Sequence, residues 1–209
     1  MSALEKLTHK QGRRDQVPNQ ELAKDLATRK DRRGIREIAE NLWNKDKHIQ
    51  ADCIKVMYEI GYLNPKLIAA HVPDFIKLLS SRNNRLVWGA MIALSTVAEI
   101  VPQEIFAHVD KITRAMEHGS VITVDNGVKI LARVAATKEE YNPKIFPYLV
   151  EHLKNCRPKE VAQHAESTLP AVNAKNKQQF VDVLMTRQAA LSAAQSARIK
   201  KILKTLEKI

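Results

Sequence analysis

The sequence repeats itself at a spacing of 37 residues. The stretches that begin at Asn64 and Val101 share Pro, Ile, Ala, His and Val at matching positions, and the match continues without a gap through residues 87–98 and 124–135. A further copy precedes these two, and a fourth begins at Asn142. A fixed period of this length is typical of chains built from stacked supersecondary units, each in contact with its neighbours.

Each copy predicts two helices joined by a short polar turn. A proline stands at the expected first helical position, at Pro65, Pro102 and Pro143, where its missing N–H removes no helical hydrogen bond. Apolar residues then recur at spacings of three and four. The second helix is more uniformly apolar and smaller, as in residues 86–98. This pattern predicts a helix buried between neighbouring units, because a single hairpin has too little core to fold alone.

The repeats are flanked by two regions that we expect to act as caps. Residues 1–33 predict a basic, partly flexible N-terminal cap with one helix, for which Asn19 is a candidate N-cap, and a loop around residues 10–18. Residues 175–209 predict basic C-terminal capping helices, the last beginning near Ser192. Stacked arrays need terminal units with a polar outer face. The four repeats between the caps are expected at about 34–63, 64–100, 101–141 and 142–174.

The residues within a repeat resemble those of HEAT repeats. The two helices of the second copy read HVPDFIKLL at 71–79 and LVWGAMIAL at 86–94. The resemblance extends over about 34–174 and implies an all-α fold, a right-handed α-solenoid of helical hairpins of the armadillo type. One departure is that the arginine expected in the second helix is replaced in every copy. The residues at that position are Gln50, Val87, Val124 and Ala162.

Composition excludes several other classes. Six glycines and 5% aromatic residues argue against a β-sandwich, and two cysteines rule out a disulfide framework and favour a reducing compartment. The N-terminus lacks the apolar core of a signal peptide. The most apolar run, residues 86–101, is shorter than the roughly 20 residues that cross a bilayer. We therefore expect a cytoplasmic protein with no membrane partner.

Charge is distributed unevenly along the chain. The net charge of +11 comes from +5 in residues 1–36 and +6 in residues 174–209, around a neutral middle. Two basic ends can attract phosphate or an acidic partner, although solvated terminal helices would show the same composition. The candidate anion or nucleic-acid contacts are Arg29, Lys30, Arg32, Arg33, Arg36, Arg198, Lys200, Lys201, Lys204 and Lys208.

Catalytic and cofactor motifs do not stand out. There is no phosphate loop, dinucleotide fingerprint, nucleophile elbow or zinc-protease motif. His152 and Cys156 lie four residues apart with His164 downstream, but an isolated i, i+4 pair without two further ligands is weak evidence for a metal. Cys53 aligns with a small core position. We predict no catalytic residue, no metal site and no cofactor.

The leading hypothesis is a non-catalytic scaffold that binds a protein or peptide on a concave face formed by successive second helices. The alternative is a nucleic-acid-binding protein that uses the basic ends. Some HEAT-like proteins are glycosylases of alkylated DNA, which line a basic concave surface with Trp, Asp and Arg. Trp88, Asp125 and Arg133 are of these residue types, although Trp88 also suits packing between hairpins. A metal- or small-molecule-binding enzyme is a third possibility, and the oligomeric state is left open. The candidate partner contacts are Gln50, Lys55, Trp88, Asp125, Lys129 and Arg133.

Overall fold

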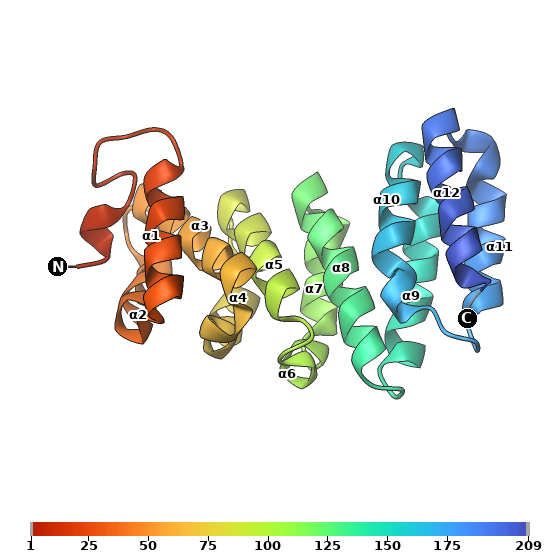
Figure 1. The fold of residues 1–209 in the computed structure, drawn as a ribbon, viewed down its shortest axis with the longest axis horizontal. Coiled ribbons are helices and arrows are strands. Elements are labelled where there is room, and N and C mark those ends of the chain that lie inside the picture. Colours follow the sequence, from red (N-terminus) through yellow and green to blue (C-terminus); the bar gives the residue numbers. More distant parts are fainter. Residues whose placement is uncertain (1, 208–209) are drawn as a thin grey trace. The chain divides into compact units, whose positions relative to one another are not determined.

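The structure is a computed structural model that describes residues 2–207. Within that range it contains twelve α-helices, six short 3-10 segments and no strand (Figure 1). None of the described helices is long and apolar enough to cross a membrane. The chain forms two compact units, divided between Gly127 and Val128, and helix α8 (Val121–Thr137) runs through the division.

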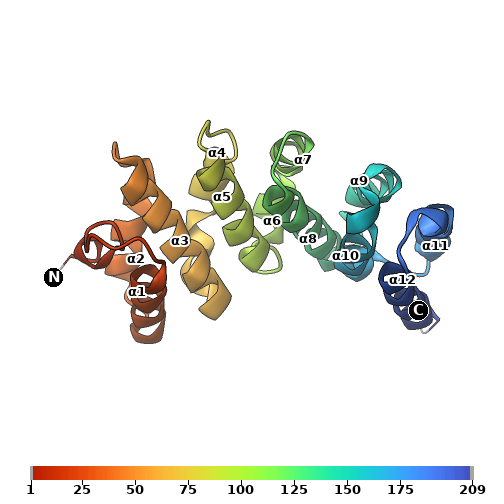
Figure 2. The same ribbon diagram turned by 90° about the horizontal axis from the view of Figure 1, so that it is seen from above.

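The first unit is organised around α3, which packs against α1 on one side and α5 on the other (Figures 1 and 2). Cys53, Ile54 and Met57 of α3 are fully buried, as is Ala90 of α5. Burial of Cys53 confirms its assignment to the core. The helices of this unit before α8 are α1 (Val17–Arg29), α2 (Arg32–Glu40), α3 (Lys47–Leu63), α4 (Val72–Leu78), α5 (Asn84–Val97), α6 (Pro102–Phe106) and α7 (Val109–Glu117).

The second and third repeats have an extra segment that the two-helix interpretation missed. Pro65 opens a 3-10 turn, followed by a second one at Ala69–His71, before α4 begins. Pro102 opens the five-residue α6, and α7 begins only after His108. The prolines therefore start short leading segments and not the first helices themselves. The α-helix starts only after this histidine, whose backbone angles lie outside the α-helical region in both copies (ψ 10° and 20°).

The N-terminal cap is packed onto α3 through buried polar contacts. Asn19 lies inside α1 and is fully buried, while Gln16 takes the position before the helix. The expectation that Asn19 is the N-cap is therefore wrong. Its amide oxygen accepts the backbone N–H of Thr8 at 3.0 Å, and its amide nitrogen donates to Asp52 at 2.8 Å. Asn19 joins the N-terminal loop to α3.

The second unit contains the end of α8 and two further helical pairs. Helices α9 and α11 pack together, as do α10 and α12 (Figure 2). Ser192 opens α12 with a capping box, in which its hydroxyl and the Gln195 side chain satisfy each other's backbone N–H groups. Ile199 and Ile202 are buried, so α12 is the amphipathic final helix expected from the sequence. The bounds are α9 (Asn142–Asn155), α10 (Pro158–Thr168), α11 (Lys177–Arg187) and α12 (Ala193–Leu206).

Candidate functional site

An ion pair lies on the partly exposed side of α3. Lys55 and Glu59 are one helical turn apart, their side chains are 12% and 21% exposed, and they form a close ion pair. The Lys55 ammonium also lies 4.8 Å from the centre of the Tyr58 ring. Burial opposes the charge on Lys55, but hydrogen bonds to Glu59 and Tyr58 outweigh it and raise the Lys55 pKa. Lys55 thus stays charged within a mostly buried setting.

Aromatic side chains extend this surface from α3 to α5. The ring centres of Tyr58 and Trp88 are 6.1 Å apart, and those of Tyr58 and Tyr62 are 6.0 Å apart in an edge-to-face arrangement. The Arg85 guanidinium lies 6.0 Å from the Trp88 ring. Tyr62 is 59% exposed although it is aromatic. We call Tyr58, Tyr62 and Trp88 the aromatic ridge.

Tyr62 was missed by the sequence analysis. It stands seven residues after Lys55, two turns along the same side of α3, and that spacing was the available signal. Trp88 was identified, and its contact with Tyr58 agrees with the packing interpretation of that residue. Within the ridge, Trp88 packs between two hairpins, whereas Tyr62 points into solvent.

The other predicted partner contacts are distributed over two helices. Gln50 donates from its amide to the carbonyl of Asn44 at 2.8 Å, so it holds the turn before α3. Asp125, Lys129 and Arg133 are half-buried and recur every four residues along α8, which places them on one side of that helix. Of the six candidates, Trp88 belongs to the aromatic ridge and Lys55 lies against its Tyr58 ring.

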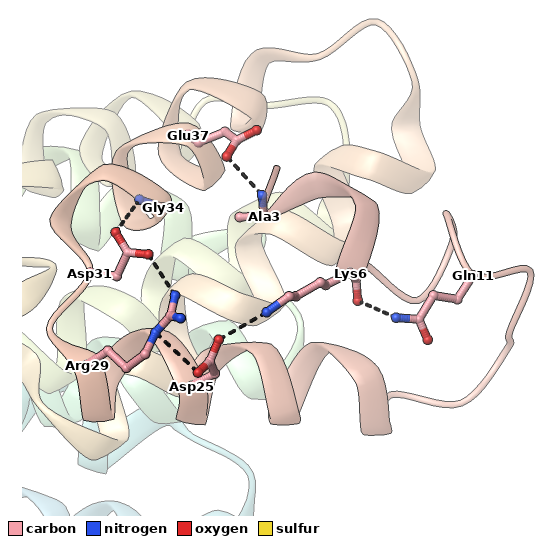
Figure 3. Close-up of polar contacts among 8 residues, drawn as sticks. All are labelled: Ala3, Lys6, Gln11, Asp25, Arg29, Asp31, Gly34 and Glu37. Carbon is pink, nitrogen blue, oxygen red and sulfur yellow. Dashed lines mark hydrogen bonds and ion pairs between the residues drawn. The ribbon is translucent and has the colours of Figure 1, made fainter. Parts of the chain in front are cut away.

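At the N-terminal basic region, acidic residues neutralise part of the charge (Figure 3). Arg29 contacts Asp25 at 3.3 Å and Asp31 at 3.0 Å, and Lys6 contacts Asp25 at 3.1 Å. The hydrogen bond from the backbone N–H of Gly34 is the main cause that lowers the Asp31 pKa, with Arg29 adding to it. Arg29 is consequently tied to two carboxylates. The exposed cations around it are Lys30, Arg32, Arg33 and Arg36.

In the C-terminal basic region, too, one candidate cation is paired with a carboxylate and the others that the structure describes are exposed. Arg198 donates two hydrogen bonds to the Glu166 carboxylate, at 2.8 and 2.6 Å. This contact lowers the Glu166 pKa and raises that of Arg198. Lys208 lies outside the described residues. The exposed cations of α12 are Lys200, Lys201 and Lys204.

The hairpin of α9 and α10 brings together three residues that the sequence analysis discounted. His152 Nε2 and His164 Nδ1 are 2.9 Å apart. One ligand atom from each of these histidines and the Cys156 sulfur all lie within 4.8 Å of one another. Cys156 and His164 are buried and His152 is half-buried. Burial raises the Cys156 pKa to about 11, against the opposing effect of the Arg187 guanidinium.

Comparison with known proteins identifies the fold. No protein-family model matches the chain, and no curated protein matches it by sequence. An engineered protein of known structure superposes on all of this chain and 98% of its own with a TM-score of 0.70 at 18% identity. A designed armadillo repeat protein, solved in complex with the peptide (KR)4, matches 89% of this chain and 86% of its own (TM-score 0.69, 13% identity).

A further structural neighbour is one of the computationally designed armadillo repeat proteins for modular peptide recognition. The match covers 97% of this chain and 97% of that one, with a TM-score of 0.68 at 15% identity. Identities this low establish the fold and nothing more specific. The prediction of an all-α solenoid of HEAT- and armadillo-like repeats is confirmed. The fold of this chain is that of an armadillo-type α-solenoid.

Proposed function

We propose that the protein is a scaffold that binds an extended peptide segment of a partner protein on the second-helix face of its first unit. The aromatic ridge carries this proposal. Tyr62 exposes 59% of its surface beside a half-buried Trp88. Tyrosine and tryptophan are enriched in the energetically dominant parts of protein interfaces. Solenoids of stacked helical repeats offer extended surfaces for such contacts.

The chemistry of the ridge favours an aliphatic or cationic side chain of the partner. Lys55 pairs with Glu59, and the charged groups of Lys55 and Arg85 lie 4.8 and 6.0 Å from the Tyr58 and Trp88 rings, so these rings already accommodate cations. Aromatic faces attract cations and bury apolar stems at low entropic cost. The designed neighbour that binds (KR)4 supports a peptide ligand for this type of fold. In this chain, Asp125, on the part of α8 that belongs to the first unit, would extend the contact.

The two tryptophans provide a matched test. Trp43 lies in the 3-10 segment Asn41–Trp43, donates from Nε1 to Asp74 at 3.2 Å and has Lys77 4.4 Å from its ring. It is 42% exposed and has no contact with the ridge among the contacts described. We expect peptides selected from an unbiased library on the intact protein to lose at least about tenfold in affinity with Trp88→Ala, which corresponds to roughly 1.4 kcal/mol.

Trp43→Ala should leave that affinity unchanged. Circular dichroism and urea unfolding of both variants would show that each is folded before binding is compared. A library that yields no specific ligand, or ligands weakened equally by both substitutions, would contradict the proposal. Tyr62→Ala supplies a second variant whose exposed side chain contributes little to the core.

A second candidate is an anionic partner, such as a nucleic acid, at the turn between α1 and α2. Lys30, Arg32, Arg33 and Arg36 are exposed there, and no ion pair is described for any of them. Binding that rests on them should weaken steeply with salt because phosphate contacts release counterions. A salt series with labelled duplex and single strands tests this, with the double variant Arg33→Glu/Arg36→Glu compared against Lys24→Glu on the exposed side of α1. Equal binding by both variants would exclude this surface.

A further inference from the structure

Helices α9 and α10 of the second unit bring a set of soft and borderline metal ligands together at one point. His152 belongs to the last turn of α9, Cys156 follows directly after that helix, and His164 lies in the second turn of α10. The ring centres of the two histidines are 4.8 Å apart. Two imidazoles and one thiol thus meet from three separate backbone positions.

The backbone of the hairpin fixes this arrangement. The Cys156 N–H donates to the carbonyl of His152 at 2.8 Å, which ends α9. Pro158 opens α10 only two residues later, so the chain reverses within a very short turn. Arg187 of α11 donates to the Cys156 carbonyl at 2.6 Å and secures the turn from outside. The positions of the three ligands therefore follow from a rigid turn and not from a mobile loop.

The donor set and its dimensions match zinc. Imidazole nitrogen and thiolate sulfur are the usual zinc ligands, at about 2.0–2.1 Å and 2.3 Å. Two nitrogens on a tetrahedral zinc ion are then roughly 3.3 Å apart. The facing nitrogens are now 2.9 Å apart and all three ligand atoms lie within 4.8 Å. Small side-chain rotations would bring them to zinc-binding distances.

We propose that His152, Cys156 and His164 form a zinc-binding site. The ion would replace the direct contact between His152 Nε2 and His164 Nδ1. The proton of that hydrogen bond would move to the other ring nitrogen of the donor histidine, and the thiol would release its proton to solvent on binding. Half-buried His152 provides the route of entry, and the cluster found among the described residues holds three ligands, which leaves the fourth position to water or an external ligand. Three protein ligands and one open position are the arrangement of zinc sites that act on a bound water or an external ligand.

The experiment compares the two cysteines of the full-length protein. Cys156→Ser removes the proposed sulfur ligand, whereas Cys53→Ser alters a fully buried cysteine in the other unit. Each protein is reduced, incubated with excess zinc, freed of unbound ion and analysed for metal and protein. We expect wild type and Cys53→Ser to retain about one equivalent of zinc, and Cys156→Ser and His152→Asn to bind at least about tenfold more weakly.

Cobalt(II) in place of zinc identifies the ligands directly. Wild type and Cys53→Ser should show a thiolate-to-cobalt charge-transfer band and the intense visible bands of a four-coordinate ion, and Cys156→Ser should lack the charge-transfer band. Two results would overturn the assignment. One is a wild-type protein that retains no zinc, and the other is zinc bound equally well by Cys156→Ser, which would place the ion elsewhere. Because His152 is only half-buried at a helix end, His152→Asn keeps the test open if Cys156→Ser fails to fold.

Discussion

Asp52 in α3 and His164 in α10 occupy the same position of the repeat but have different roles. Each precedes the small buried residue of its second helix, Cys53 or Ala165, and each is itself buried. Asp52 accepts the His9 N–H at 2.7 Å and the Asn19 amide at 2.8 Å, so it attaches the N-terminal cap. His164 instead meets His152 within its own hairpin.

The two intervening repeats use this position in two further ways. Gly89 makes room for Ile54, since a Cβ there would lie 2.6 Å from the Ile54 Cγ1 atom. Asn126 accepts the Ser95 hydroxyl at 3.2 Å and donates to the Ile122 carbonyl at 2.8 Å. A repeated position thus has a constant burial and a variable partner. Periodicity therefore predicts where a side chain lies but not what it contacts.

The largest effect is expected for Asp52→Ala. It leaves the His9 N–H and the Asn19 amide without their acceptor, and hydrogen bonds to a buried charged group are costly to remove. We expect a loss of about 3 kcal/mol in the free energy of unfolding, measured in urea. Asn83→Ala removes only the N-cap of α5, the acceptor of the Arg85 N–H at 3.1 Å, and should cost about 1 kcal/mol. Equal losses would mean that Asp52 does not attach the cap.

Gly89→Ala tests the close approach of α3 and α5. Crowding against Ile54 should cost about 2 kcal/mol, and the gain in helix propensity should return about 1 kcal/mol. The expected net loss is therefore about 1 kcal/mol. In a double-mutant cycle, Gly89→Ala should cost less free energy of unfolding in the Ile54→Ala background than in wild type, because the Ile54 atom that the new Cβ meets is gone. Strict additivity would contradict the close contact.

Asn126→Ala should destabilise the protein by about 1 kcal/mol, less than Asp52→Ala, because a neutral amide is removed. The check is a cycle with Ser95→Ala in urea unfolding. The Ser95 hydroxyl also has the Ile92 carbonyl within reach at 2.7 Å, so part of its bonding survives. A loss as large as that of Asp52→Ala would remove the distinction between the two positions.

The smallest effect concerns His71, at a position that His108 repeats 37 residues later. Burial lowers the His71 pKa below its usual 6.5, and Asp74 opposes this only in part. The folded state therefore binds fewer protons than the unfolded state just below pH 6.5, and stability falls as the pH drops through that range. His71→Asn should flatten the change in urea midpoint between pH 7.5 and pH 5.5. If the urea midpoint of His71→Asn still changes between these pH values as much as that of wild type, His71 does not cause the pH dependence.

The fold was largely predictable from the sequence because burial recurs with the repeat. The alignment of Cys53 with Ala90 placed it in the core, and the amphipathic pattern after Ser192 gave the last helix. The leading segments at Pro65 and Pro102 were missed because a proline suits the first turn of any helix, including a very short one. The sequence pattern did not show that α4 and α7 begin only after His71 and His108.

The site was less predictable because its contacts cross long stretches of chain. Asn19 suits a helix cap by type, and its actual partner Asp52 lies 33 residues away. The contact of His152 with His164 depends on how tightly α9 and α10 are joined, which the i, i+4 spacing does not reveal. The exposure of Tyr62 depends on where α3 ends relative to its neighbours.

The most direct test of the proposed binding surface observes both tryptophans at once. The chain has two tryptophans, whose indole N–H groups give separate signals in a nitrogen–proton correlation spectrum. On titration with a peptide selected on the intact protein, we predict that the Trp88 signal shifts and the Trp43 signal stays in place. A shift of Trp43 with Trp88 unmoved would place the partner at Trp43 and not at the aromatic ridge, and would contradict the proposed binding surface.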